Sequence, residues 1–142
     1  MSTQVLPDVV ELRNGDKAPG IFPDEEIDRR LQRLRGYMEE QGIRHVLFTS
    51  YHNIDYYSGY LYCSFGRDYG LVVSSDANTT ISANIDYGQP WRRSHGANIT
   101  YTDWRRDNFF RAIARLIPNG TTVGIEHDHL TLRNLAKLES RS

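Results

Sequence analysis

Residues 23–49, PDEEIDRRLQRLRGYMEEQGIRHVLFT, decide the fold because a helical pattern is followed there directly by a strand pattern. Pro23 suits a first helical position, and the three acidic residues after it complement the helix dipole. The apolar positions recur at helical spacing: Ile27, Leu31, Leu34 and Met38. Gly42 can end the helix, and the short apolar run at 44–49 then predicts a buried strand.

Further strands are expected along the rest of the chain. Runs at 69–74 and 79–85 flank the turn residues 76–78, which predicts a hairpin. Runs at 97–101 and 121–126 predict two more strands. The sequence therefore predicts several short strands rather than a helical bundle.

Each remaining helix is expected from a residue that can start it. The expected starts are Asn53 for a brief helix at 54–58, Gln89 for a short helix, Asp107 for a helix with an apolar face at 110–117, and Thr131 for a last helix carrying Leu132, Leu135 and Leu138. Residues 1–21 have no sustained period and are expected to form an arm or an edge segment. This order predicts one α/β domain over residues 1–142, with helices flanking a mixed sheet. Because the order ends on a helix, we expect the chain to be a piece cut from a longer protein.

Composition excludes several function classes. Apolar residues make up 39% of the chain, charged residues 25%, and the mean hydropathy is -0.59, as in ordinary globular proteins. With a net charge of -1, the chain has no overall positive charge that would attract nucleic acid or an anionic membrane as a partner. Cys63 is the single cysteine and excludes an intramolecular disulfide, and no apolar run approaches the roughly 20 residues of a membrane span. We expect a cytoplasmic protein.

An aromatic segment at 48–69, FTSYHNIDYYSGYLYCSFGRDY, is the best candidate for a ligand site. It contains six tyrosines, two phenylalanines and one arginine, Arg67. A guanidinium holds a carboxylate in a bidentate fork while rings exclude water, so the segment favours a pocket for a small anionic or zwitterionic ligand. The alternative for Arg67 is an ordinary salt bridge at the surface.

Other candidate residues have simpler interpretations. In a strand, His127 and His129 of the EHDH run would share a face with metal-ligand spacing, but no third or fourth ligand has an obvious spacing. The alternative is a loop that caps the last helix, and we expect no metal or other cofactor. The remaining histidines are expected to be structural or surface residues: His45, His52 and His95. Cys63 is expected to pack as a buried residue, and no nucleophile with a partnered base is evident.

Arginine is unusually frequent, with 15 arginines against only Lys17 and Lys137. Four are expected on the polar, solvated side of the first helix, paired with Asp28, Glu39 and Glu40: Arg29, Arg30, Arg33 and Arg35. Another group mixes guanidinium groups with rings: Arg92, Arg93, Arg105 and Arg106 with Trp91, Trp104 and Tyr101. Such a mixture is typical of an RNA-binding face or a protein interface, and the negative net charge favours the interface.

Five separated runs resemble the amino-terminal domain of the creatinase (creatine amidinohydrolase) family. The runs are RNGDK (13–17), FTSYHNIDYYSGYLYCSFGR (48–67), ISANIDYGQPWRR (81–93), YTDWRRDN (101–108) and GIEHDHL (124–130). The resemblance extends over about residues 13–139, nearly the whole chain. It implies the ribonuclease H-like α/β architecture of the pita-bread group, which includes prolidase and aminopeptidase P.

The resemblance also implies a function. Creatinases are homodimers that hydrolyse creatine to sarcosine and urea without a metal, with the catalytic residues in a larger carboxy-terminal domain. That domain is expected to lie outside this chain, so we expect no catalytic residue here and no activity of the chain alone. In the family, the amino-terminal domain of one subunit reaches the active site of the other. Carried over by position, Arg67 would bind the substrate carboxylate and Phe65 would pack against the substrate.

Two departures from the family pattern bear on substrate preference. Asp68 follows Arg67 where the family has proline, and its carboxylate could compete for the guanidinium or point to solvent. Asp55 stands where the family has asparagine. Two alternatives are the amino-terminal domain of an Xaa-Pro metallopeptidase, which has a similar fold, and a non-catalytic binding or dimerisation module.

Overall fold

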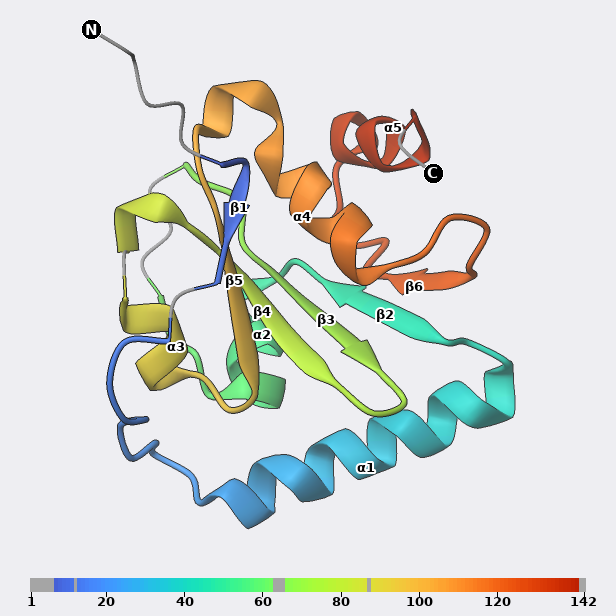
Figure 1. Cartoon of the computed structure of the whole chain (residues 1–142). Helices are drawn as coiled ribbons and strands as arrows, with labels where there is room; N and C mark the ends of the chain where they lie inside the picture. The colour runs from blue at the N-terminus through green and yellow to red at the C-terminus, as the bar shows by residue number, and fades with distance from the viewer. Residues whose placement is uncertain (1–6, 12, 63–65, 87, 141–142) are drawn as a thin grey trace, which may run out of the picture.

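A mixed sheet lies at the centre of the computed structural model, which describes residues 7–11, 13–62, 66–86 and 88–140. In this part the sheet has six strands in the order β1-β5-β4-β3-β2-β6 (Figure 1). The strands are β1 Val9–Val10, β2 His45–Phe48, β3 Gly70–Ser74, β4 Asn78–Ala83, β5 Ala97–Tyr101 and β6 Val123–Ile125. The helices are α1 Asp24–Gln41, α2 Tyr51–Ser58, α3 Gln89–Arg93, α4 Asn108–Leu116 and α5 Leu132–Ser140, with 3₁₀ turns η1 Asn84–Asp86 and η2 Trp104–Arg106.

Strand pairing confirms the expected mixed α/β fold. β3 and β4 form the predicted hairpin, and β2 pairs antiparallel with β3. β4 pairs parallel with β5, and β2 pairs parallel with β6, each across a connection that contains helix. At the far edge β1 pairs antiparallel with β5, which places Val9–Val10 in an edge strand. Residues 1–6 of the expected arm lie outside the described residues.

Helices cover both faces of the sheet (Figure 1). On one face, Phe48 of β2 stacks on Tyr57 of α2 with ring centroids 4.8 Å apart. On the other face, a side-chain carbon at Gly70 would lie within 3.4 Å of Phe109 in α4 and Leu47 in β2. Neighbouring residues of β2 therefore pack to opposite sides, as strand geometry requires. Gly70 lets α4 approach the sheet closely.

Helix α1 matches the predicted helix, but its arginines do not all lie in solvent. Pro23 occupies the position before the first helical residue, with extended backbone, rather than the first helical position. Gly42 ends the helix in the left-handed conformation, as expected. Arg30 is only 9% exposed, and its guanidinium lies over the rings of Phe22 and Tyr56. The expectation of a surface role is therefore wrong for Arg30, because long side chains bury their stems and stack on rings.

The ion pairs of α1 also differ from those expected. Arg29 and Arg30 both pair with Glu26, at 2.7 Å and 3.2 Å. Asp28 instead contacts His95, whose Nε2 lies 2.7 Å from Asp28 Oδ1 and whose Nδ1 lies 3.3 Å from Asp24 Oδ1. His95 is thus a structural histidine, as expected, that connects the start of α1 to the segment before β5.

Of three predicted helix caps, one is wrong, one is correct in position only, and one is confirmed. Ser50, not Asn53, caps α2, because Asn53 N donates to Ser50 Oγ at 3.3 Å and the helix begins at Tyr51. Asp107 precedes α4 without a capping hydrogen bond from its side chain, which instead accepts a bond from Lys137 Nζ at 2.7 Å. Thr131 caps α5, since Asn134 N donates to Thr131 Oγ1 at 3.1 Å. Within the described residues, no helix is long and apolar enough to span a membrane.

Candidate functional site

The loop between α2 and β3 carries Arg67, and stacked tyrosines hold its two ends together. Tyr62 stacks on Tyr69 with ring centroids 4.0 Å apart, and on Tyr60 at 5.6 Å. The rings of Tyr60 and Tyr69 are buried, so part of the predicted aromatic pocket is in fact core. Phe65 and Cys63 lie outside the described residues. The loop therefore leaves the core at Tyr60 and returns to it at Tyr69.

Asp86 lies near a tyrosine at each end of this loop. Tyr69 Oη donates to Asp86 Oδ2, and the charge of the same carboxylate acts on the Tyr60 hydroxyl. Burial raises the pKa of both phenols, and the negative charge of Asp86 raises it further, so both hydroxyls remain protonated donors. No sequence pattern indicates this arrangement, because Asp86 follows β4 and has no regular spacing to the tyrosines.

Arg67 borders a cavity of about 340 Å³. The cavity is lined by polar and aromatic residues: Thr49, Tyr51, Tyr62, Gly66, Arg67, Asp68, Tyr69, Phe109, His129, Leu130, Thr131 and Asn134. The guanidinium lies over the indole of Trp104, with Cζ 4.3 Å from the ring centroid. Among the described residues, no carboxylate forms an ion pair with Arg67. Arg67, the predicted cation, thus borders a cavity, and no carboxylate of a described residue pairs with its charge.

The departure at Asp68 does not neutralise Arg67. The backbone carbonyl of Asp68 accepts a hydrogen bond from Tyr101 Oη at 2.8 Å, and its carboxylate interacts with Asn134. Burial raises the pKa of Asp68, while Asn134 and the positive charges of Lys137 and Arg133 act against that rise. The carboxylate therefore engages α5 rather than the neighbouring guanidinium.

Asp55, the second residue that departs from the family pattern, lies at a different cavity from Arg67. Asp55 lines a cavity of about 470 Å³ together with Phe22, Asp24, Arg93 and His95. Within the described residues this cavity shares no lining residue with the one at Arg67. Asp55 therefore has no direct contact with the candidate site.

The EHDH run forms a loop rather than a strand, because β6 ends at Ile125. Glu126 accepts hydrogen bonds from Thr49 N at 2.6 Å, Ser50 N at 2.9 Å and Asn53 Nδ2 at 2.8 Å. Burial acts to raise the pKa of Glu126, but these hydrogen bonds to Ser50, Asn53 and Thr49 outweigh it and lower the pKa. Glu126 thus fixes the start of α2, a capping role that the sequence analysis assigned to the wrong helix.

The two histidines of this run do not form a metal site in the structure. His129 Nδ1 lies 2.8 Å from Thr49 Oγ1, at the edge of the Arg67 cavity. In the described ranges, no group of three or more histidine, cysteine or acidic side chains is placed to hold a metal.

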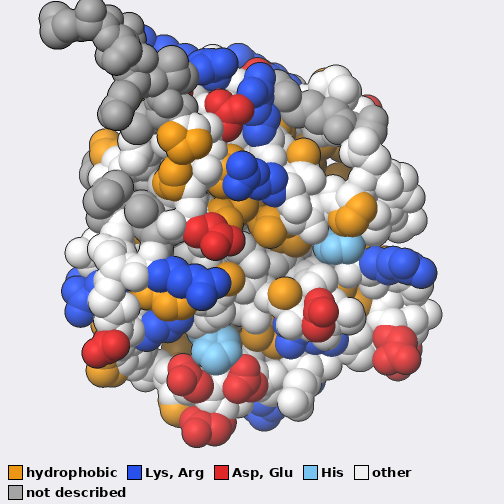
Figure 2. Space-filling view, viewed as in Figure 1, with side chains coloured by type: hydrophobic (Ala, Val, Ile, Leu, Met, Phe, Trp, Pro, Cys, Tyr) orange, Lys and Arg blue, Asp and Glu red, His pale blue; other side chains and the backbone are white. Residues whose placement is uncertain are grey.

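The arginine and tryptophan residues expected in one group form two clusters. Trp91 in α3 lies under Lys17 Nζ, 3.6 Å from its ring centroid, and also near Arg13. Trp104 follows β5 and contacts Arg67 and Arg105. Because α3 precedes β5 and η2 follows it, the two clusters lie at opposite ends of that strand. Figure 2 shows acidic and basic side chains interspersed on the face viewed there, rather than a field of one sign.

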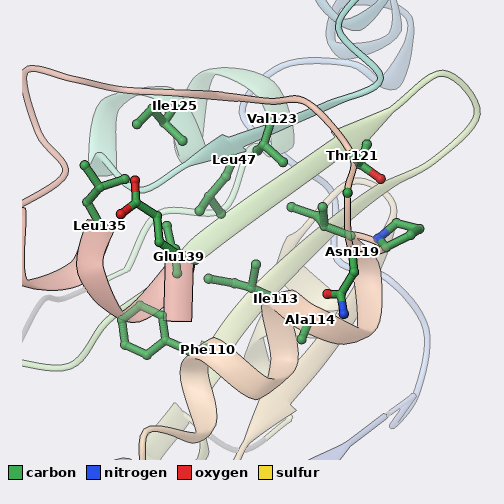
Figure 3. Close-up of a pocket in the computed structure, with 14 residues that line it drawn as sticks. Leu47, Phe110, Ile113, Ala114, Asn119, Thr121, Val123, Ile125, Leu135 and Glu139 are labelled. Carbon is green, nitrogen blue, oxygen red and sulfur yellow. The ribbon is translucent and has the colours of Figure 1, made fainter. Parts of the chain in front are cut away.

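A third cavity, of about 220 Å³, lies between α4, α5 and β6 (Figure 3). Its lining is mainly aliphatic and aromatic, including Leu47, Phe110, Ile113 and Leu135, with Glu139 at one side (Figure 3). The polar side chains of this lining are Asn119, Thr121 and Glu139, and none of the lining residues is a cation that could bind a carboxylate. The cavity at Arg67 is therefore the better candidate functional site.

Comparisons with known proteins agree with this geometry. The Creatinase/Prolidase N-terminal domain model matches residues 30–142. A curated relative, a creatinase from Bacillus sp. (strain B-0618), is 53% identical over 122 residues, covering 83% of this chain and 30% of the relative. The chain thus spans less than a third of that relative's length.

Solved structures share the fold. The creatinase/prolidase N-terminal domain of an X-Pro dipeptidase from Streptococcus pyogenes has a TM-score of 0.68 at 22% identity, covering 79% of this chain and 86% of that one. The prolidase from Pyrococcus furiosus has a TM-score of 0.66 at 22% identity, covering 80% of this chain and 32% of that one. Together with the family match over most of the sequence, these likenesses show that the chain belongs to the creatinase/prolidase N-terminal domain family.

Proposed function

We propose that this chain is the substrate-positioning and dimer-contact domain of a creatinase, which hydrolyses creatine to sarcosine and urea. In this proposal the Arg67 guanidinium binds the creatine carboxylate and Phe65 packs against the substrate. The reacting groups come from a carboxy-terminal domain like the remainder of the longer relative. The enzyme works as a homodimer in the cytoplasm, where a single cysteine suits reducing conditions.

One observation carries this proposal: an arginine that borders a polar, aromatic-lined cavity and whose guanidinium has no ion-pair partner among the described residues. Unpaired cations beside cavities are suited to anionic ligands, and the planar fork of arginine matches a carboxylate. The identity of 53% to a creatinase supports creatine as that ligand. Correct positioning of the substrate affects the reaction rate strongly, because a displacement of about 1 Å can reduce a rate by about 100-fold.

A peptidase domain is the second candidate. The solved structures of similar fold are those of prolidases and an X-Pro dipeptidase. Such an enzyme would also place a carboxylate, that of a dipeptide substrate, near a cation. Metal analysis of the full-length protein separates the two candidates, because the family resemblance implies a creatinase without metal and a peptidase with metal ligands in its catalytic domain. A non-catalytic binding module is the third candidate, and would show neither activity in full-length form.

The experiment joins this domain to the remainder of the Bacillus creatinase, in place of the 122 residues that it matches. Creatine hydrolysis is measured for the chimera and for its Arg67→Ala and Arg67→Lys variants. Arg115→Ala, an exposed position near the end of α4, is the matched control. The isolated chain should give no creatine hydrolysis above a buffer blank.

We expect Arg67→Ala to lower kcat/KM for creatine by about 100-fold, or about 3 kcal/mol, because a bidentate charge-assisted contact is lost. Arg67→Lys should recover only part of this loss, since an ammonium lacks the planar fork. Unchanged kinetics in Arg67→Ala would refute the role of Arg67. A folded chimera that fails to hydrolyse creatine, or turnover by the isolated chain, would refute the proposed division of labour.

A further inference from the structure

Trp104 is the one ring over which the structure places the Arg67 guanidinium within the described residues. We propose that Trp104 is a positioning residue, which holds this guanidinium at the cavity while leaving its N–H donors open to a carboxylate. The inference rests on the proposed function in one respect, namely that Arg67 binds the substrate carboxylate.

Stacking geometry explains how Trp104 can hold Arg67 without occupying its N–H donors. The guanidinium lies with Cζ 4.3 Å from the indole centroid, within the range of a cation–π contact. Such a contact uses the flat face of the group, whereas its five N–H donors lie in the plane. A carboxylate can therefore bind in that plane while the indole remains in place. An ion pair would do the opposite, because a protein carboxylate would occupy the same donors.

The backbone around Trp104 is shaped to present this ring. Asp103 and Asp107 flank η2 with φ of 43° and 57°, and they are the only described residues other than glycine with positive φ. Left-handed backbone is costly for such residues, although aspartate tolerates it better than most, and strain of this kind clusters at functional sites. The turn is closed at its base, where Asn108 Nδ2 donates to the carbonyl of Thr102.

Packing alone does not account for the position of Trp104, because the side chain is 50% exposed. Trp91 provides the contrast. The ammonium above it, Lys17 Nζ, donates three hydrogen bonds of 2.6–2.7 Å to the backbone carbonyls of Trp91, Ser94 and Gly96. That cation is used fully by the fold. Arg67 stacks on an equally aromatic partner but makes no hydrogen bond to a described residue, so its donors are available to a ligand.

The first arm of the test measures the position of Arg67 in the 142-residue chain itself, by nuclear magnetic resonance. The Arg67 Nε–Hε signal, assigned by its loss in Arg67→Lys, should be displaced by the indole ring current and show restricted motion. Trp104→Leu should return the signal to the position of a solvent-exposed arginine and increase its motion. Trp91→Leu is the matched control and should leave the signal unchanged. A signal that is identical in Trp104→Leu and the parent chain would overturn the inference.

The second arm measures creatine kinetics in the chimeric enzyme. We expect Trp104→Leu to raise KM about tenfold with kcat changed less than about threefold, because the lost contact acts on carboxylate binding. Trp104→Phe keeps a ring and should recover most of the loss. The urea concentration at the midpoint of unfolding should be nearly the same in the parent enzyme, Trp104→Leu and Trp104→Phe. This result would exclude a general loss of structure.

The outcomes separate this inference from the proposed function. If Arg67→Ala impairs the enzyme but Trp104→Leu does not, the positioning role is refuted and the proposed function stands. If Arg67→Ala has no effect, the proposed function is refuted, and the resonance measurement still decides whether Trp104 holds Arg67. A Trp104→Phe variant as impaired as Trp104→Leu would refute the requirement for an aromatic face.

Discussion

Arg30 and Arg67 both stack on aromatic rings, but the fold uses them differently. The Arg30 guanidinium lies over Phe22 and Tyr56, donates to the backbone carbonyl of Tyr56 at 2.9 Å and contacts Glu26 at 3.2 Å. Arg67 lies over Trp104 and has no such hydrogen bond within the described residues. The comparison teaches that ring stacking alone does not mark a binding arginine. The in-plane donors decide the role, since buried or occupied donors stabilise the fold and open donors can bind a ligand.

The largest expected difference between Arg30 and Arg67 is in how much each contributes to the stability of the fold. Arg30→Ala should lower the free energy of unfolding by about 3 kcal/mol, because two ring contacts and a partly buried hydrogen bond are lost. Arg67→Ala should change it by less than about 1 kcal/mol, since its stacking partner is half exposed. Urea unfolding of the isolated chain measures both.

Arg29→Ala is the matched control for Arg30, because Arg29 pairs with the same Glu26 but is exposed to solvent. It should leave the unfolding curve nearly unchanged. Equal destabilisation by Arg30→Ala and Arg67→Ala would mean that both arginines are structural, and the comparison would fail.

A second, smaller effect concerns the loop that presents Arg67. Asp86→Ala should destabilise the chain by about 2 kcal/mol, because the Tyr69 hydroxyl loses its acceptor in a largely buried setting. Asp86→Asn retains an acceptor oxygen and should cost less than half as much. Urea unfolding again provides the measurement. If both variants are as stable as the parent chain, the tyrosine stack alone closes the loop and Asp86 has no such role.

The smallest effect concerns Glu126, whose acceptor oxygens are satisfied by the start of α2. Its pKa is lowered from the ordinary value of 4.5, so the folded state favours the ionised carboxylate. That contribution is fully present above about pH 4.5 and is lost as pH falls through the lower, folded pKa. Glu126→Gln should therefore be about 1 kcal/mol less stable than the parent chain at pH 7.

The pH dependence gives the test of this assignment. The difference between the parent chain and Glu126→Gln should shrink as unfolding is measured at successively lower pH below 4.5, the ordinary value for this group. A difference that stays constant from pH 7 to pH 3 would show that the charge of Glu126 does not stabilise the start of α2.

Local patterns were enough to predict most of the elements. Apolar spacing and a terminal glycine predicted α1, and two apolar runs around a polar turn predicted the hairpin of β3 and β4. The helix caps were less predictable. Serine and asparagine both suit a cap, and the choice of Ser50 over Asn53 depends on Glu126, which holds the preceding backbone from a distant part of the chain.

The candidate site was predictable only in part. Arg67 was identified as the cation within an aromatic run, but the buried role of Arg30 was not, because a helical pattern does not report which distant rings cover a side chain. For a related reason, the sequence did not indicate that the group of tryptophans and arginines divides into two clusters. Its members are close in sequence, yet the length of β5 separates them.

The α/β class, the order of most elements and the family can be predicted from the sequence alone, because periodicity, turn residues and extended motifs are local properties of the chain. Which arginine keeps its donors open is visible only in the folded chain, since that depends on groups brought together from distant segments. The contact of Trp104 with Arg67 and the hydrogen bond of Tyr69 to Asp86 are of this kind. Hydrogen bonding and ring stacking act over a few ångströms in space, whatever the separation along the chain.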